Sequence, residues 1–116
     1  MKTIIAGSRT LGDIETIDYL VGELPWVITE VVSGGAKGVD RYGEIWGESE
    51  HIPVKVYPAE WDKYGKSAGF IRNLEMADYA DCLLAIWDGG SKGTKHMIEA
   101  MKKRNKPVYV QIINGE

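Results

Sequence analysis

The stretch that decides the fold reads Asp81-Cys82-Leu83-Leu84-Ala85-Ile86-Trp87 and continues Asp88-Gly89-Gly90-Ser91-Lys92-Gly93-Thr94. Its first half is a short apolar run bounded by glycines, which is typical of a strand buried on both faces. An amphipathic pattern from Lys95 to Lys103 predicts a helix after the glycines. A strand, a glycine-rich turn and a helix N-terminus in this order can hold a phosphate on free N–H groups. A plain strand-to-helix turn fits the pattern equally well.

Outward from this stretch, similar apolar runs alternate with helical patterns along the whole chain. Further strands are expected at Thr3–Ala6, Val27–Val32, Val54–Tyr57 and Pro107–Ile112. Further helices are expected from an N-cap at Asp13 to Pro25, from Val39 through Trp46, and from Ser67 or Ala68 to about Tyr79. We expect an irregular segment over 58–66 and a tail over 114–116. This alternation predicts an α/β fold, a Rossmann-like three-layer sandwich around a five-stranded parallel sheet in the order 3-2-1-4-5. We expect one domain over residues 1–116.

Composition and length exclude several classes of protein. The chain has 116 residues, of which 44% are hydrophobic and 27% charged, as in an ordinary globular domain. No apolar stretch has the length of a membrane span and no signal-peptide pattern is present, so we expect a cytoplasmic protein with no membrane partner. The single Cys82 lies inside an apolar run. The two histidines of the chain, His51 and His96, are distant from it and from each other in sequence, so no metal-ligand spacing exists. We expect no metal and no cofactor.

Charge is unevenly distributed along the chain. The net charge of −3 argues against broad nucleic-acid binding. The glycine-containing connections 7–12, 33–41, 66–73 and 88–95 nevertheless hold seven basic and only two acidic residues. This asymmetry indicates a compact anionic ligand at one edge of an otherwise acidic molecule.

The turn from Ser33 to Asp40 is the strongest local signal. It contains three glycines and Lys37 where a strand becomes a helix, so that N–H groups and an ammonium group can converge on an anion. It matches neither a P-loop nor the dinucleotide fingerprint. Asp40 is either a carboxylate favoured by the helix dipole or a hydrogen-bond partner for a ribose or for the turn itself.

Several other side chains are candidates for ligand contacts. Arg9 can bind a phosphate or lie free on the surface, whereas Arg72 and Asn73 are expected to face the same crevice as the turns. Trp61 and Tyr64 can stack on a base or pack as a lid, and Thr94 can cap the last helix while donating to a phosphate. The predicted ligand-binding residues are Gly7, Ser8, Arg9, Ser33, Gly34, Gly35, Ala36, Lys37, Gly38, Asp40, Arg72, Asn73, Asp88, Gly89, Gly90, Ser91, Lys92, Gly93 and Thr94.

These motifs resemble the signatures of the SLOG superfamily, a Rossmann-like group that includes the DprA/Smf DNA-processing proteins and the LOG phosphoribohydrolases. The resemblance is carried by Gly7-Ser8-Arg9, by the Ser33–Asp40 turn and by Gly90-Ser91-Lys92-Gly93-Thr94. Ala59-Glu60-Trp61, Tyr64-Gly65-Lys66, Ala68-Gly69 and Arg72-Asn73 resemble its small YspA-like branch, which is common in bacteria and phages.

The resemblance implies a site for a nucleotide or a nucleotide-derived small molecule. The first hypothesis is a sensor or sequestering protein, the second a LOG-like hydrolase that cleaves the N-glycosidic bond of nucleoside monophosphates, and the third a DprA-like binder of single-stranded DNA. LOG enzymes carry a glutamate where this chain has Met97, and Glu99 is placed on a different part of the helix. The acidic chain makes nucleic acid the least expected partner. A homodimer or a higher homo-oligomer is expected.

Overall fold

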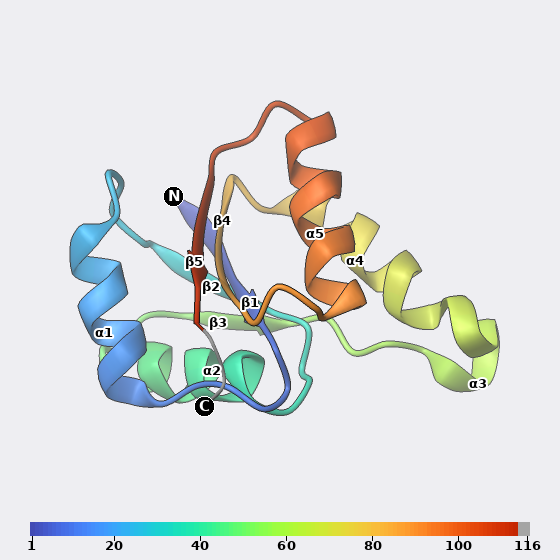
Figure 1. Ribbon diagram of the computed structural model, residues 1–116, viewed down its shortest axis with the longest axis horizontal. Coiled ribbons are helices and arrows are strands. Elements are labelled where there is room, and N and C mark those ends of the chain that lie inside the picture. Colours follow the sequence, from blue (N-terminus) through green and yellow to red (C-terminus); the bar gives the residue numbers. More distant parts are fainter. Residues whose placement is uncertain (114–116) are drawn as a thin grey trace.

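Five parallel strands form one sheet in the order β3-β2-β1-β4-β5 in the computed structural model, which describes residues 1–113 (Figure 1). The strands are β1 (Lys2–Gly7), β2 (Glu30–Ser33), β3 (Val54–Val56), β4 (Cys82–Trp87) and β5 (Val108–Ile112). The predicted fold class and strand order are therefore confirmed. The tail expected at 114–116 lies outside the described residues.

Strand β4 lies inside the sheet, between β1 and β5. It pairs with β1 in a register that places Ile4 beside Leu83 and Ala6 beside Ala85. Every residue from Cys82 to Ile86 is fully buried. The unbroken apolar run is explained by this position, because helices cover both faces of a parallel sheet.

Helices cover the two faces of the sheet as separate layers (Figure 1). On one face, α1 (Ile14–Glu23) and α2 (Val39–Ser49) pack on a core that includes Ile5. On the other face, α4 (Ala68–Tyr79) and α5 (Lys92–Lys103) pack on a core that includes Ile4. Ile4 and Ile5 are neighbours on β1 and enter opposite cores, because successive side chains of a strand point to opposite faces of the sheet. The three-layer sandwich is confirmed.

Several element boundaries differ from those expected, among them the starts of β2 and α5. Strand β2 begins at Glu30 and not at Val27, whose side chain is 78% exposed. Helix α5 begins at Lys92, three residues before the start predicted from its pattern, and its N-cap is Ser91. Thr94 therefore lies inside the first turn, and the prediction that it caps the helix is wrong. The capping prediction for Asp13 is confirmed, since its carboxylate accepts the N–H of Thr16 at 2.7 Å.

The segment expected to be irregular contains short helical elements. They are α3 (Trp61–Tyr64) and the 3₁₀ helix η1 (Gly65–Ser67), which lead directly into α4. One helical turn has too few residues for a hydrophobic period, so the pattern could not reveal it. Within residues 1–113, no helix combines the length and the apolar character that a bilayer crossing requires.

Candidate ligand-binding cleft

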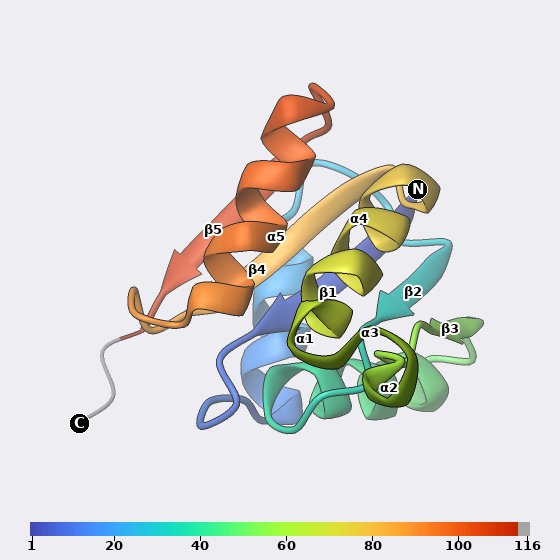
Figure 2. The ribbon, with the colours of Figure 1, turned by 90° about the vertical axis from the view of Figure 1, so that its right-hand side faces the viewer.

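The connections that follow β1, β2 and β4 all leave the carboxyl edge of the parallel sheet, toward which the strand arrows point in Figure 2. The buried Ser8 joins all three of them. Its N–H donates to the carbonyl of Ile86 at 3.1 Å, and its carbonyl accepts the N–H of Val39 at 3.4 Å. Its hydroxyl accepts the N–H of Asp88 at 3.0 Å. Ser8 thus holds the three connections in one arrangement.

Two glycines allow these connections to approach so closely. A Cβ atom on Gly7 would lie 2.0 Å from the carbonyl oxygen of Ile86, and one on Gly38 would lie 2.4 Å from the carbonyl oxygen of Arg9. Gly38 also has a φ of 73°, which disfavours any residue with a side chain. Both glycines are therefore explained by contacts within the protein.

A narrow inner cleft opens between the ends of β1 and β2 and the first turns of α4 and α5. Its volume is about 90 Å³, enough for a handful of water molecules or one part of a nucleotide. Its walls combine polar groups with the buried sulfur-containing side chains of Met76 and Met97. It is lined by Ala6, Gly7, Arg9, Gly34, Ala36, Asp40, Arg72, Asn73, Met76, Ser91, Gly93, Thr94 and Met97.

A wider outer cleft continues from the inner one. The two share Arg9, Gly34, Ala36 and Arg72, and the outer cleft has a volume of about 440 Å³. The residues found only in the outer cleft are Gly35, Lys37, Val56, Pro58, Ala59 and Trp61. A side hollow of about 170 Å³ beside Arg9 and Arg72 adds Lys66, Gly69 and Phe70.

Several N–H groups of the glycine-rich turns are bound by the protein's own side chains. The N–H groups of Gly90 and Ser91 donate to the carboxylate of Asp88 at 2.7 and 2.8 Å. In the other turn, the N–H of Gly35 donates to the hydroxyl of Ser33 at 3.1 Å. Free N–H groups remain in the first turn of α5, where across residues 1–113 the N–H groups of 92–94 have no acceptor. The chain therefore offers an anion fewer main-chain donors than its glycines suggest.

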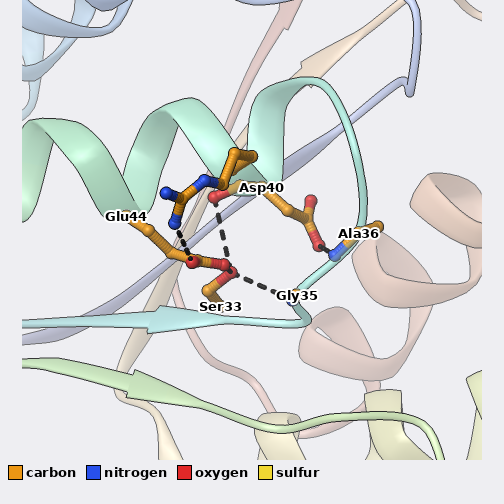
Figure 3. A network of polar contacts seen from close by, with 6 residues as sticks. Ser33, Gly35, Ala36, Asp40 and Glu44 are labelled. Carbon is orange, nitrogen blue, oxygen red and sulfur yellow. Dashed lines mark hydrogen bonds and ion pairs between the residues drawn. The ribbon is translucent and has the colours of Figure 1, made fainter.

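A buried network holds the Ser33–Asp40 turn on α2 (Figure 3). The hydroxyl of Ser33 donates to Glu44 at 2.7 Å, and Arg41 binds the other oxygen of Glu44 at 3.1 Å. The sequence analysis did not single out Glu44. Its position four residues after Asp40 puts both carboxylates on one face of the helix, which was the available signal.

Arg72 and Asn73 bring α4 to the cleft, as predicted. A guanidinium nitrogen of Arg72 donates to the carbonyl of Gly34, and Nε donates to the side chain of Asn73 at 3.0 Å. The amide nitrogen of Asn73 lies 3.2 Å from both the carbonyl of Gly93 and Nδ1 of His96. The pair thus links the start of α5 to the turn after β2. Burial lowers the pKa of His96 below its ordinary value.

Asp40 is the carboxylate of the inner cleft, with only 6% of its surface exposed. Burial raises the pKa of Asp40 to about 6, against the opposing effects of the Ala36 N–H and the positive charge of Arg72. The two charged groups face each other across Gly34: a Cβ atom there would lie 2.8 Å from Nη1 of Arg72 and 2.9 Å from Oδ2 of Asp40. The pKa of Arg72 is lowered, chiefly by burial.

The predicted ligand-binding residues divide into two groups. The clefts bring together Gly7, Arg9, Gly34, Gly35, Ala36, Lys37, Asp40, Arg72, Asn73, Ser91, Gly93 and Thr94. Ser8, Ser33, Gly38, Asp88, Gly89, Gly90 and Lys92 line neither the inner nor the outer cleft. Among the second group, Ser8, Ser33 and Asp88 bind other parts of the connections. Trp46 is buried, and Trp87 is half-buried.

A family model described as "YspA, cpYpsA-related SLOG family" matches residues 1–64, more than half of the chain. The chain belongs to this SLOG family. The matched residues include both Gly7-Ser8-Arg9 and the Ser33–Asp40 turn. The gene 61 protein of Mycobacterium phage D29 is 36% identical in an alignment that covers 92% of this chain and 93% of that protein. No solved structure shows a significant match.

The position at which LOG enzymes carry a glutamate is apolar in this SLOG chain. Met97 is buried in the wall of the inner cleft. Glu99 lies on another face of α5, where it is exposed and 4.0 Å from Lys95. Asp40 is therefore the only carboxylate among the residues that line the two clefts.

Proposed function

We propose that this chain binds a nucleotide or a nucleotide-derived small molecule in the connected clefts, as a sensor or sequestering protein of the cytoplasm. The observation that carries the proposal is the placement of three cationic side chains and one exposed indole around the same opening. The cationic residues are Arg9, Lys37 and Arg72, and the indole belongs to Trp61. Membership in a SLOG family is consistent with a nucleotide-related ligand.

The cations supply the attraction for an anionic group. Arg9 and Lys37 are exposed at the rim, whereas Arg72 is half-buried at the junction of the two clefts. A guanidinium group can bind two phosphate oxygens at once, and an ammonium group acts as a point charge. The unpaired N–H groups at the start of α5 add further donors to the inner cleft.

Trp61 supplies a surface for a base. It stands on the short helix α3, with 54% of its surface exposed, and lines both the outer cleft and the side hollow. Val56, Pro58 and Ala59 extend the apolar surface beside it. Every nucleobase has an aromatic face that can stack on an indole, whatever its hydrogen-bonding edge. Tyr64, the other aromatic residue predicted to stack, lines neither cleft.

The two other hypotheses have less support. A LOG-type hydrolase requires the carboxylate that Met97 replaces. Binding of single-stranded DNA requires a long positively charged groove, but the net charge is −3 and the cations gather at one opening.

The test is isothermal titration calorimetry with the four nucleoside 5′-monophosphates, cyclic nucleotides and ADP-ribose. We expect at least one to bind, and we expect Trp61→Ala to weaken it by about 1–3 kcal/mol, the usual contribution of one stacked base. Lys37→Ala should weaken the same ligand by removing a rim charge.

Matched controls are Tyr19→Ala, which removes an exposed aromatic ring from α1, and Lys102→Ala, which removes an exposed cation from the last turn of α5. Both should leave affinity unchanged. The proposal is wrong if no nucleotide binds, or if Trp61→Ala and Lys37→Ala are both silent. Chromatography of the titrated mixtures for free base would reveal hydrolysis.

A further inference from the structure

The inner cleft holds a buried acidic acceptor as well as the N–H donors at the start of α5. The carboxylate of Asp40 forms part of its wall and is more than nine-tenths buried. Its carboxylate accepts the N–H of Ala36 at Oδ2 over a long distance of 3.4 Å, and the N–H of Gly7 also favours its charged form. Every fully buried side-chain nitrogen or oxygen of the described residues has a partner, so the second oxygen of Asp40, for which no hydrogen bond is found, keeps some accessible surface.

The surroundings keep this carboxylate charged near neutral pH without satisfying it. Arg72 on α4 and the N–H groups of Ala36 and Gly7 favour the charged form, whereas burial and Glu44 on the same helix oppose it. Arg9 reaches the cleft from the connection after β1. Helix α5 contributes Gly93, Thr94 and Met97 to the wall, and none of these carries a charge. Asp40 is therefore an acceptor with unused capacity in a narrow cleft.

A phosphate in the inner cleft would place negative oxygens against Asp40. A sugar hydroxyl would instead donate to it, and a hydrogen bond to a charged acceptor in a desolvated site is among the stronger ones. The small volume of the inner cleft, about 90 Å³, also suits one part of a nucleotide. The outer cleft, about 440 Å³, has an indole that suits the base and rim cations that suit the phosphate.

The geometry points to a ligand whose sugar hydroxyls donate to Asp40 in the inner cleft, while its phosphate lies on the rim cations and its base on Trp61. Asp40 is then a specificity-determining residue that selects ribose over deoxyribose. This inference rests on the proposed function, because it assigns the parts of a nucleotide to the parts of the cleft.

The substitution Asp40→Asn distinguishes a ligand with its sugar in the inner cleft from one with its phosphate there. The amide preserves the shape of the side chain but removes its charge and one acceptor. With a sugar in the inner cleft, the ribonucleotide that binds best in the calorimetric panel should lose about tenfold to a hundredfold in affinity. With a phosphate there, the same variant should bind it more tightly, because a repulsion is removed.

The second arm uses the protein without substitution. The 2′-deoxy and 3′-deoxy analogues of that ribonucleotide are titrated into the native chain and into the Asp40→Asn variant. We expect at least one analogue to bind the native chain about tenfold more weakly than its parent, and expect this difference to shrink several-fold in the variant. Asp62→Asn, a change of an exposed aspartate outside both clefts, should alter neither affinity.

A third readout is the pH dependence of affinity. Between pH 7.5 and 5, protonation of Asp40 should weaken ribonucleotide binding to the native chain more than to the Asp40→Asn variant. The comparison removes the contributions of the ligand phosphate and of His96, which titrate in both proteins.

The outcomes distinguish the two proposals. If no nucleotide binds, the proposed function fails and this inference fails with it. If nucleotides bind, yet Asp40→Asn binds them more tightly and the deoxy analogues match their parents, the assignment of the sugar to Asp40 is overturned while the proposed function stands.

Discussion

The carboxyl group of Asp40 is buried, and burial disfavours its charged form. Its pKa is raised from 3.8 to about 6, chiefly by burial, so the folded chain binds a proton more readily than the unfolded chain. Between about pH 4 and pH 6 the folded state therefore holds more protons, and its stability falls as the pH rises through this range. Above pH 6 the loss is complete, at about 3 kcal/mol for a shift of this size.

Replacement of Asp40 should therefore stabilise the protein in a pH-dependent way. At pH 8 we expect the free energy of unfolding of Asp40→Asn to exceed that of the native chain by up to about 3 kcal/mol, which raises the urea midpoint. This difference should fall toward zero near pH 4. Urea titrations at pH 4, 6 and 8 measure this. A variant that is less stable by the same amount at every pH would contradict the buried, poorly solvated state of this carboxylate.

At the residue scale, the sequence predicted which side chains are near the cleft better than it predicted what they do. Arg72 was expected to face the crevice because a cation among apolar neighbours of a helix needs a polar outlet. Its contact with the Gly34 carbonyl depends on how α4 packs beside β2, which no local pattern contains. Likewise, the pattern could not show that Ser33 would use its hydroxyl on Glu44.

Helix α2 packs closely on the sheet at two of its glycines. A Cβ atom on Gly43 would lie 2.9 Å from Cγ2 of Ile5, and one on Gly47 would lie 2.9 Å from side-chain atoms of Val31 and Val54. Both contacts are with β-branched side chains that have little freedom to move away. The helix thus brings Asp40, in its first turn, up to the ends of β1 and β2.

A pair of matched substitutions tests this close packing. Gly43→Ala should destabilise the chain by about 1–3 kcal/mol, because the added methyl group overpacks the core by more than the gain in helix propensity. Gly22→Ala in α1, where an added Cβ meets no atom within 4 Å, should instead stabilise by about 0.5–1 kcal/mol. Thermal unfolding of both variants gives the comparison. Equal behaviour of the two would show that α2 does not depend on close packing at Gly43.

At the scale of elements, the strands were predictable and the ends of some elements were not. The five apolar runs and their spacing were sufficient for the sheet and its order, since right-handed crossovers leave few alternatives. The start of α5 was missed because Gly93 reads as part of a loop. Asp88 explains the difference: its carboxylate binds the N–H groups of Gly90 and Ser91, which closes the turn early and lets the helix begin at Lys92.

The whole molecule is acidic, yet it concentrates basic side chains at one opening. Of the residues that line the outer cleft, Arg9, Lys37 and Arg72 are basic and none is acidic, in a chain whose net charge is −3. Such a distribution attracts a small anion to the cleft while the remaining surface repels a long polyanion. The self-association expected from the sequence stays a prediction.

We therefore expect single-stranded DNA to bind weakly. At 0.15 M salt, a labelled 20-nucleotide oligomer should show no saturable anisotropy change up to about 100 µM protein, the weak end of ordinary non-specific affinity. A control with a nucleotide ligand from the calorimetric panel should show binding under the same conditions. Micromolar affinity for the oligomer that falls steeply with added salt would instead favour a DNA-binding role.

The position of Ser8 also limits how the cleft can be altered. Its N–H and hydroxyl bind Ile86 and Asp88 at the end of β4, and its carbonyl binds Val39 at the start of α2, so the turns that follow three strands share one anchor. Exchange of a single turn with that of a relative would shift the other two as well. A change of ligand preference therefore requires that the three turns be exchanged together, along with Ser8, which joins them.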